Sequence, residues 1–146
     1  MGTITTAMCN SFKQELLGGV HDLDTHTLKI ALIKPSQSGS YGAATTNYSD
    51  VTGNSDEATG TNYSAGGQTL DSAAISLSGS TALVDFADEV FTNLTISAAG
   101  AIIYNSSVSN KAIAVFSFGG TVTSTSGDFT VVFPTADASN AVIRIA

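Results

Sequence analysis

The chain has 146 residues, of which 42% are hydrophobic and only 12% are charged, and its formal net charge is −7. This length favours a single domain with its own hydrophobic core, and the apolar fraction excludes a disordered chain. The few basic residues are scattered, so they cannot form the cationic surface that nucleic acid or an anionic membrane requires, and we expect neither as a partner.

The first element that the sequence predicts is an amphipathic α-helix over Ala7–Leu17. Thr5 or Thr6 can act as its N-cap, and Gly18-Gly19 follows as a C-terminal stop. A helix of about three turns is not stable alone, so it must dock on its own domain or on a neighbouring subunit, and both remain open. We place residues 1–19 in the same domain as residues 20–146. The candidate subunit-contact residues lie on the apolar face of this helix: Met8, Phe12, Leu16 and Leu17.

The connector His21–His26 carries two histidines and two aspartates and therefore raises the question of a metal site. Its H-D-x-D-x-H spacing fits no standard zinc pattern, and no second ligand cluster follows. Cys9, the only cysteine, excludes an intramolecular disulfide and is expected to be a small buried side chain rather than a nucleophile. We expect a solvated connector, with no metal and no cofactor.

The stretch Thr27–Ile33 predicts the first strand, which Pro35 ends. The polar segment Ser36–Gly67 is too long for an ordinary loop, and short edge strands at Ala44–Tyr48 and Thr61–Ser64 would break it up. Three tyrosines in this segment could anchor it or be displayed as a binding platform for carbohydrate or a receptor: Tyr41, Tyr48 and Tyr63.

The densest group of acidic residues also lies in this segment, between Asp50 and Glu57. Its carboxylates could hold a calcium ion, although their offsets fail the EF-hand template. A solvated loop is the interpretation that the sequence favours.

Strand signals become regular after Gly67. Gln68–Leu77 and Thr81–Ala87 predict a hairpin around the turn Ser78–Ser80, and Ala98–Gly100 predicts a bend. We expect the most apolar side chains of the later strands to be buried: Ile102, Ile113, Val115, Phe116, Val131 and Phe133. The further predicted strands are Val90–Ile96, Ala101–Tyr104, Ala112–Phe118, Phe129–Phe133 and a paired terminal strand at 141–146.

These elements predict an all-β fold: an antiparallel, jelly-roll-like β-sandwich with one short N-terminal α-helix. No helical segment separates consecutive strands, which excludes parallel βαβ units.

The residues offer little catalytic chemistry. The chain contains no G-x-S-x-G motif. Asp85, Asp88 and Glu89 lie close together and could imitate the carboxylate pair of a glycosidase, but the chain has no tryptophan to line a sugar cleft. We therefore expect a protein that is not an enzyme.

Four stretches carry a resemblance to a known family. They are C-N-S-F-K-Q-E-L-L-G-G-V-H-D from Cys9, T-L-K-I-A-L-I from Thr27, G-A-I-I-Y-N-S-S-V-S-N-K-A-I-A-V-F-S-F-G from Gly100, and F-P-x-x-D-A-x-N-A-V-I-R-I-A from Phe133. Together they resemble a family of small virion structural proteins of tailed bacteriophages. The resemblance covers most of the chain, with Pro35–Gly67 as its least distinctive part, and none of its motifs carries a catalytic residue.

The resemblance implies a virion protein that assembles in the host bacterial cytoplasm. The role it favours is a capsid cement or decoration protein, with the major capsid protein, other virion proteins and copies of itself as partners. A tail, neck or fibre-associated position and a carbohydrate- or receptor-binding module are the alternatives. The low charge suits extended, neutral contacts between subunits.

Overall fold

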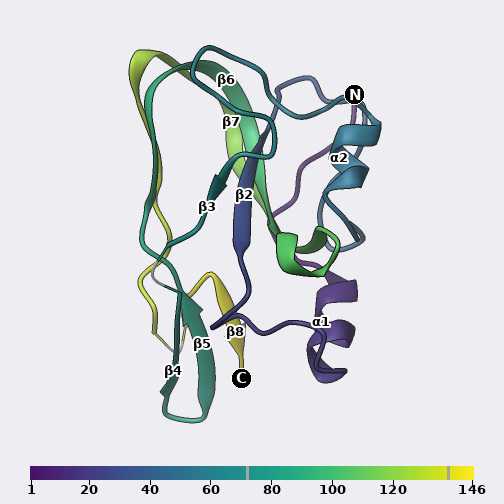
Figure 1. The fold of residues 1–146 in the computed structure, drawn as a ribbon, viewed down its shortest axis with the longest axis vertical. Coiled ribbons are helices and arrows are strands. Elements are labelled where there is room, and N and C mark those ends of the chain that lie inside the picture. Colours follow the sequence, from purple (N-terminus) through teal and green to yellow (C-terminus); the bar gives the residue numbers. More distant parts are fainter. Residues whose placement is uncertain (72, 138) are drawn as a thin grey trace.

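Two long strands, β6 (Glu89–Asn105) and β7 (Lys111–Val131), form an antiparallel ribbon in the middle of the larger sheet. The computed structural model describes residues 1–71, 73–137 and 139–146. It confirms an all-β, sandwich-like fold with two antiparallel sheets and a short N-terminal helix (Figure 1). The five-stranded sheet has the order β1-β7-β6-β2-β3, and the three-stranded sheet has the order β4-β5-β8.

The remaining elements are shorter. The strands are β1 (Ala7–Met8), β2 (Leu28–Ile33), β3 (Gln68–Thr69), β4 (Ala74–Ser78), β5 (Thr81–Asp85) and β8 (Ile143–Ile145). The helices are α1 (Asn10–Leu17), α2 (Ser49–Gly53) and the 3-10 turn η1 (Ser106–Val108). No helix in the described part of the chain is long and apolar enough to cross a bilayer.

The ribbon bends where the sequence predicts a bend, but neither strand is interrupted there. Gly100 pairs with Ser117 while Ala98 pairs with Val122, so β7 carries extra residues opposite a single residue of β6. Such a bulge turns both strands together, as the upper part of Figure 1 shows. The predicted strands Ala112–Phe118 and Phe129–Phe133 therefore belong to one segment of chain, and β7 ends at Val131.

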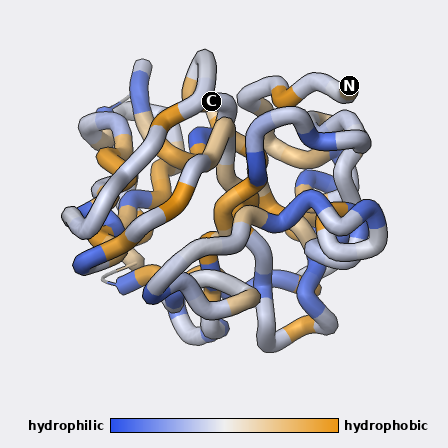
Figure 2. The backbone as a smooth tube through the Cα atoms, turned by 90° about the horizontal axis from the view of Figure 1, so that it is seen from above, coloured by the Kyte–Doolittle hydropathy of each residue, from blue (hydrophilic) through white to orange (hydrophobic). Residues whose placement is uncertain are grey.

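The core lies over the centre of the larger sheet. Ile102, Ile113 and Val115 are fully buried, as predicted. Val131 and Phe133 are also buried, whereas Phe116 is only partly buried and packs at the margin of the core. In Figure 2 the strongly hydrophilic stretches lie in loops at the outside of the molecule.

The N-terminal helix begins later than predicted. Ala7 and Met8 pair with Val115 and Ala114 as β1, and Cys9 occupies the N-cap position without a capping side chain. Thr6, a predicted cap, instead accepts a hydrogen bond from the Ser117 N–H. The prediction failed because β7 offers a free edge, which satisfies the backbone at this position better than an additional helical turn. The end of the helix is as predicted, with Gly18 at the C-cap.

The long polar segment contains no strand between 36 and 67, contrary to the predicted edge strands at Ala44–Tyr48 and Thr61–Ser64. Isolated bridges join Asn47 to Lys111 and Thr61 to Thr95, and α2 lies between them. Side-chain hydrogen bonds, described below, hold this segment instead of a ladder.

The smaller sheet is a hairpin with the C-terminal strand added. The predicted first arm, Gln68–Leu77, is divided: β3 pairs with β2, whereas β4 pairs with β5, and Ser72 between them lies outside the described residues. Ser78 pairs with Thr81, so the loop consists of Gly79 and Ser80 rather than three residues. β8 pairs with β5, which confirms that the terminal strand is paired.

Candidate functional site

The tyrosines predicted for a displayed platform point inward instead. Tyr41 is buried, and Tyr48 and Tyr63 are partly buried against the core. Their hydroxyl groups donate hydrogen bonds to two adjacent carboxylates, Asp56 and Glu57. The interpretation as an exposed binding platform is therefore wrong, and the alternative that they anchor the segment is correct.

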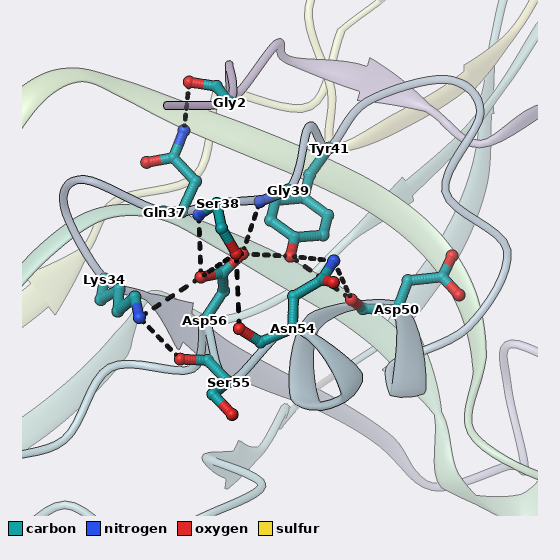
Figure 3. A network of polar contacts seen from close by, with 10 residues as sticks. All are labelled: Gly2, Lys34, Gln37, Ser38, Gly39, Tyr41, Asp50, Asn54, Ser55 and Asp56. Carbon is teal, nitrogen blue, oxygen red and sulfur yellow. Dashed lines mark hydrogen bonds and ion pairs between the residues drawn. The ribbon is translucent and has the colours of Figure 1, made fainter.

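Asp56 is the fully buried centre of the first network (Figure 3). It accepts hydrogen bonds from the N–H groups of Ser38 (3.0 Å) and Gly39 (2.8 Å) and from the Tyr41 hydroxyl (2.6 Å), and it pairs with Lys34 at 3.4 Å. Burial alone would raise the pKa of this carboxyl, but these hydrogen bonds outweigh burial and lower the pKa to about 2. Asp56 is therefore a charged anchor for the loop that follows β2.

Further bonds extend this anchor to the N-terminus. Gln37 donates from its side chain to the Gly2 carbonyl and accepts from the Gly2 N–H, both at 2.9 Å. Asn54 donates to the Tyr41 hydroxyl at 3.1 Å, and burial together with the Asp56 hydrogen bond raises the pKa of that tyrosine to about 12. The network thus joins three separate parts of the sequence, as Figure 3 shows.

Glu57 holds the second half of the segment. It accepts hydrogen bonds from the Tyr63 hydroxyl at 2.9 Å and the Gly66 N–H at 2.6 Å, and also from the Tyr48 hydroxyl. Tyr48 stacks on Tyr104 with 4.5 Å between ring centroids, and the Tyr104 hydroxyl donates to the Gly66 carbonyl at 2.6 Å. The segment that lacks strands is therefore fastened to β6 by aromatic and carboxylate contacts.

The calcium hypothesis for Asp50–Glu57 finds no support in this geometry. Asp56 and Glu57 are saturated by the donors described above, and Asp50 accepts a hydrogen bond from the Thr46 N–H at 2.8 Å. Within residues 1–71, 73–137 and 139–146, no group of three or more histidine, cysteine or acidic side chains is arranged to hold a metal ion.

The two histidines of the connector converge on Asn105 rather than on an ion. Asn105 is fully buried, and its side-chain nitrogen lies 3.1 Å from Nδ1 of His21 and 3.0 Å from Nδ1 of His26. The Ser107 N–H donates to the Asn105 side-chain oxygen, which assigns the amide nitrogen to the histidines. His21 also contacts Glu15 at 3.1 Å, and Glu15 pairs with Lys111 at 3.0 Å. This network joins α1 to the sheet.

Of the possible catalytic groups, Asp88 is held by a backbone hydrogen bond, and Glu89 and Cys9 are buried. Asp88 accepts a hydrogen bond from the Phe133 N–H at 2.9 Å, and burial together with the charge of Asp71 raises the pKa of Glu89. Cys9 is fully buried, and burial is the main cause that raises the pKa of its thiol to about 12. A protonated, inaccessible thiol is not a nucleophile.

The candidate subunit-contact residues do not form one surface. Phe12 is fully buried and packs edge-on against His21 with 5.0 Å between ring centroids, so it belongs to the core and is not available to a partner. Met8 and Leu16 are partly buried against the same core, whereas Leu17 is 92% exposed. The helix therefore contributes Leu17, and the margin of Leu16, to the surface.

A larger apolar surface lies on the smaller sheet, where the sequence analysis placed no site. The register puts Ile75, Val84 and Ile143 side by side, and it does the same for Leu77, Ala82 and Ile145. Strand alternation directs all of these side chains to one side, which we name the apolar sheet face. Ile75, Leu77 and Ile145 are 55%, 75% and 49% exposed.

A groove of about 400 Å³ runs between this face and the residues that end α1 and follow it, Leu16–Leu23. Its walls include Leu16 and Leu23 on one side and Ile75, Val84, Ile143 and Ile145 on the other. The alternation of Ala74–Ser78 could have indicated that Ile75 and Leu77 share a face. Only the long-range pairing of β5 with β8 reveals that this face continues to Ile145.

Comparison with known protein families, with curated proteins and with solved structures found no match to this chain.

Proposed function

We propose that this chain is a non-enzymatic structural protein of a tailed-phage virion, a decoration protein that binds across capsid subunits and stabilises the shell. The observation that carries the proposal is the apolar sheet face, on which Ile75, Leu77 and Ile145 remain exposed beside the groove. Contiguous exposed apolar surface is characteristic of a surface that binds another protein. The sequence resemblance to small virion proteins supplies the kind of partner.

The chemistry of this surface suits a neutral protein partner. The side chains of the apolar sheet face carry no charge, and among the described residues Asp22 is the one acidic residue that lines the groove beside it. Burial of apolar side chains contributes about 25 cal/mol per Å² removed from water. A partner that covers Ile75, Leu77 and Ile145 therefore gains affinity from apolar contacts, while the net charge of −7 keeps the free subunit soluble.

The internal networks support a structural rather than an enzymatic role. Asp56, Glu57, Asp88 and the two histidines are each held by partners in the same chain. Asp56 and Glu57 fasten the strand-poor segment to the rest of the fold. The inward-facing tyrosines also weaken the alternative of a carbohydrate-binding module, because no aromatic platform is displayed by Tyr41, Tyr48 or Tyr63.

The proposal is tested by binding of the purified protein to shells of the phage that encodes it, prepared without the protein. We expect saturable co-sedimentation at a fixed number of copies per capsomer. Ile145→Lys places a charge on the apolar sheet face and should weaken binding at least about tenfold. Val132→Lys is the matched control, because Val132 is 71% exposed and lies outside the groove.

Two results would contradict the proposal. One is the absence of saturable binding by the wild-type protein. The other is equal loss of binding in both variants, which would assign the effect to charge in general. Enrichment on tails or necks instead of shells would favour the alternative position on the particle.

A further inference from the structure

The outer edge of β4 is an unprotected strand edge. β4 is the first strand of the order β4-β5-β8, and Figure 1 shows it on the outside of the lower hairpin. Its sequence, Ala-Ile-Ser-Leu-Ser, contains no charge, proline or glycine, and no register shift interrupts its pairing with β5. Edge strands usually carry such features because they prevent pairing with another chain. Their absence indicates an edge that is covered in the assembled state.

The hairpin geometry determines which backbone groups face outward. Ser78 and Thr81 close a two-residue loop whose first residue, Gly79, has a φ of +61°. The closing pair of such a loop is hydrogen-bonded, and hydrogen-bonded and non-hydrogen-bonded pairs then alternate along the hairpin. The backbone N–H and C=O groups that bond to β5 are thus those of Ser78, Ser76 and Ala74. The N–H and C=O groups of Ile75 and Leu77 point toward the open edge.

We propose that a second copy of this chain pairs with β4 in antiparallel orientation, with Ser76 facing its counterpart across a two-fold axis. Ile75 then lies opposite the partner's Leu77, and each such pair exchanges both N–H···O bonds. The two small sheets join into one, ordered β8-β5-β4-β4′-β5′-β8′. The interface is isologous and closes on itself, as dimer interfaces commonly do.

The side chains fit this register. Around the axis, one side of the joined strands carries only Ala74, Ser76 and Ser78, and the other carries only Ile75 and Leu77. Across the axis, small side chains therefore lie opposite small side chains, and aliphatic side chains lie opposite aliphatic side chains.

The charges also permit a second copy, although each chain has a net charge of −7. The acidic groups nearest to β4 are Asp71 and Asp85, which both lie at the end of the strand marked by Ala74. Antiparallel pairing sends these ends to opposite sides. Strand spacings place the two copies of Asp85 about 20 Å apart. Salt at physiological concentration screens the repulsion between charges at that distance. The strand edge itself contributes no like charge to the contact.

This inference does not rest on the proposed function, since it concerns only copies of the same chain. It nevertheless affects that function. A two-fold axis perpendicular to the joined sheet directs both apolar sheet faces to the same side, which would double the apolar surface offered to a shell.

The first test measures the oligomeric state of the full chain by sedimentation over a range of concentrations. We expect a reversible dimer. Leu77→Pro removes an outward N–H that β5 does not use, and should raise the dimer Kd by about tenfold or more. Leu77→Ala is the matched control, because it removes the side chain but retains the N–H, and should raise Kd much less.

The second test fixes the register without destabilising the hairpin. In the proposed dimer the two copies of residue 76 form a non-hydrogen-bonded pair with about 4.5 Å between Cα atoms, which suits a disulfide. Ser76→Cys should therefore form a covalent dimer under mild oxidation. In Ser78→Cys the two copies lie about 14 Å apart and should not cross-link at a comparable rate. Buried Cys9 does not interfere.

The proposal is overturned if the wild-type chain is monomeric up to its solubility limit, or if Ser78→Cys cross-links as fast as Ser76→Cys. It is also overturned if folded Leu77→Pro dimerises like the wild type. Because shell binding is measured with Ile145→Lys, a failure here leaves the test of the proposed function intact.

Discussion

At the scale of single residues, the fold depends on two neighbouring carboxylates with different sets of donors. Asp56 anchors the loop after β2, and Glu57 anchors the residues around Gly66. The sequence analysis identified this segment by its acidic residues and its tyrosines. It could not predict which tyrosine would meet which carboxylate, since those contacts depend on how β2 and α2 place the segment.

Replacing Asp56 with Asn should destabilise the protein by about 3 kcal/mol, because an amide nitrogen would then face backbone donors that are buried. The measurement is the free energy of unfolding in urea. Asp24→Asn is the matched control, since Asp24 is exposed and its carboxylate makes no hydrogen bond or ion pair with the described residues. It should change stability by less than about 0.5 kcal/mol. Equal effects of the two substitutions would contradict the assignment of Asp56 as an anchor.

The same carboxylate makes stability depend on acid pH. The pKa of Asp56 is lowered in the folded state from 3.8 to about 2, so the folded protein binds this proton less readily than the unfolded chain. The resulting stabilisation is complete above about pH 4 and is lost as the pH falls toward about 2; it amounts to about 2 kcal/mol. Urea unfolding at a series of pH values should show a shallower decline over this window in Asp56→Asn. An unchanged slope would show that Asp56 is not responsible.

At the scale of elements, the sequence predicted the kinds of structure better than their limits. The strand at Thr27–Ile33 agrees with β2 to within a residue, and the bend near Gly100 is present. Two of the errors share one physical cause, which is pairing between distant segments. Ala7–Met8 became a strand because β7 had a free edge, and Gln68–Leu77 divided because its two halves found partners in different sheets.

The bend of the ribbon should require glycine at position 100. A Cβ atom there would lie 2.5 Å from the Phe116 carbonyl oxygen, which is backbone and cannot rotate away. We expect Gly100→Ala to lower stability by about 1–3 kcal/mol. Gly53→Ala is the control, because a Cβ at that position meets nothing within 4 Å. Thermal melts of both variants provide the comparison, and a melting temperature for Gly100→Ala equal to that of the control would show that the ribbon tolerates the side chain.

The helix should behave as part of the core through Phe12 and as surface through Leu17. Phe12→Ala should cost about 3–5 kcal/mol of stability, as is usual for a large buried side chain. Leu17→Ala, next to the C-cap and 92% exposed, should cost less than about 0.5 kcal/mol. The measurement is the free energy of unfolding of both variants in denaturant. A loss of stability for Phe12→Ala as small as that for Leu17→Ala would contradict the core assignment and leave Phe12 as a possible subunit contact.

At the scale of the whole molecule, the sandwich-like body leaves Ile75, Leu77 and Ile145 exposed on the face of the small sheet and leaves the outer edge of β4 unpaired among the described residues. We propose that the face binds a virion partner and that the edge binds a second copy of the chain. The sequence alone predicted an assembly protein through its resemblance but located the contact on α1. It missed the apolar sheet face because that surface unites residues from β4, β5 and β8 that are far apart along the chain.

The most direct test is a cryo-electron microscopy reconstruction of the phage particle to which we propose that the protein belongs. The account predicts density for this sandwich-like body at symmetry-related positions on the shell, with Ile75, Leu77 and Ile145 turned toward capsid subunits. A particle without such density, or density in which the β4-β5-β8 sheet faces solvent, would contradict it.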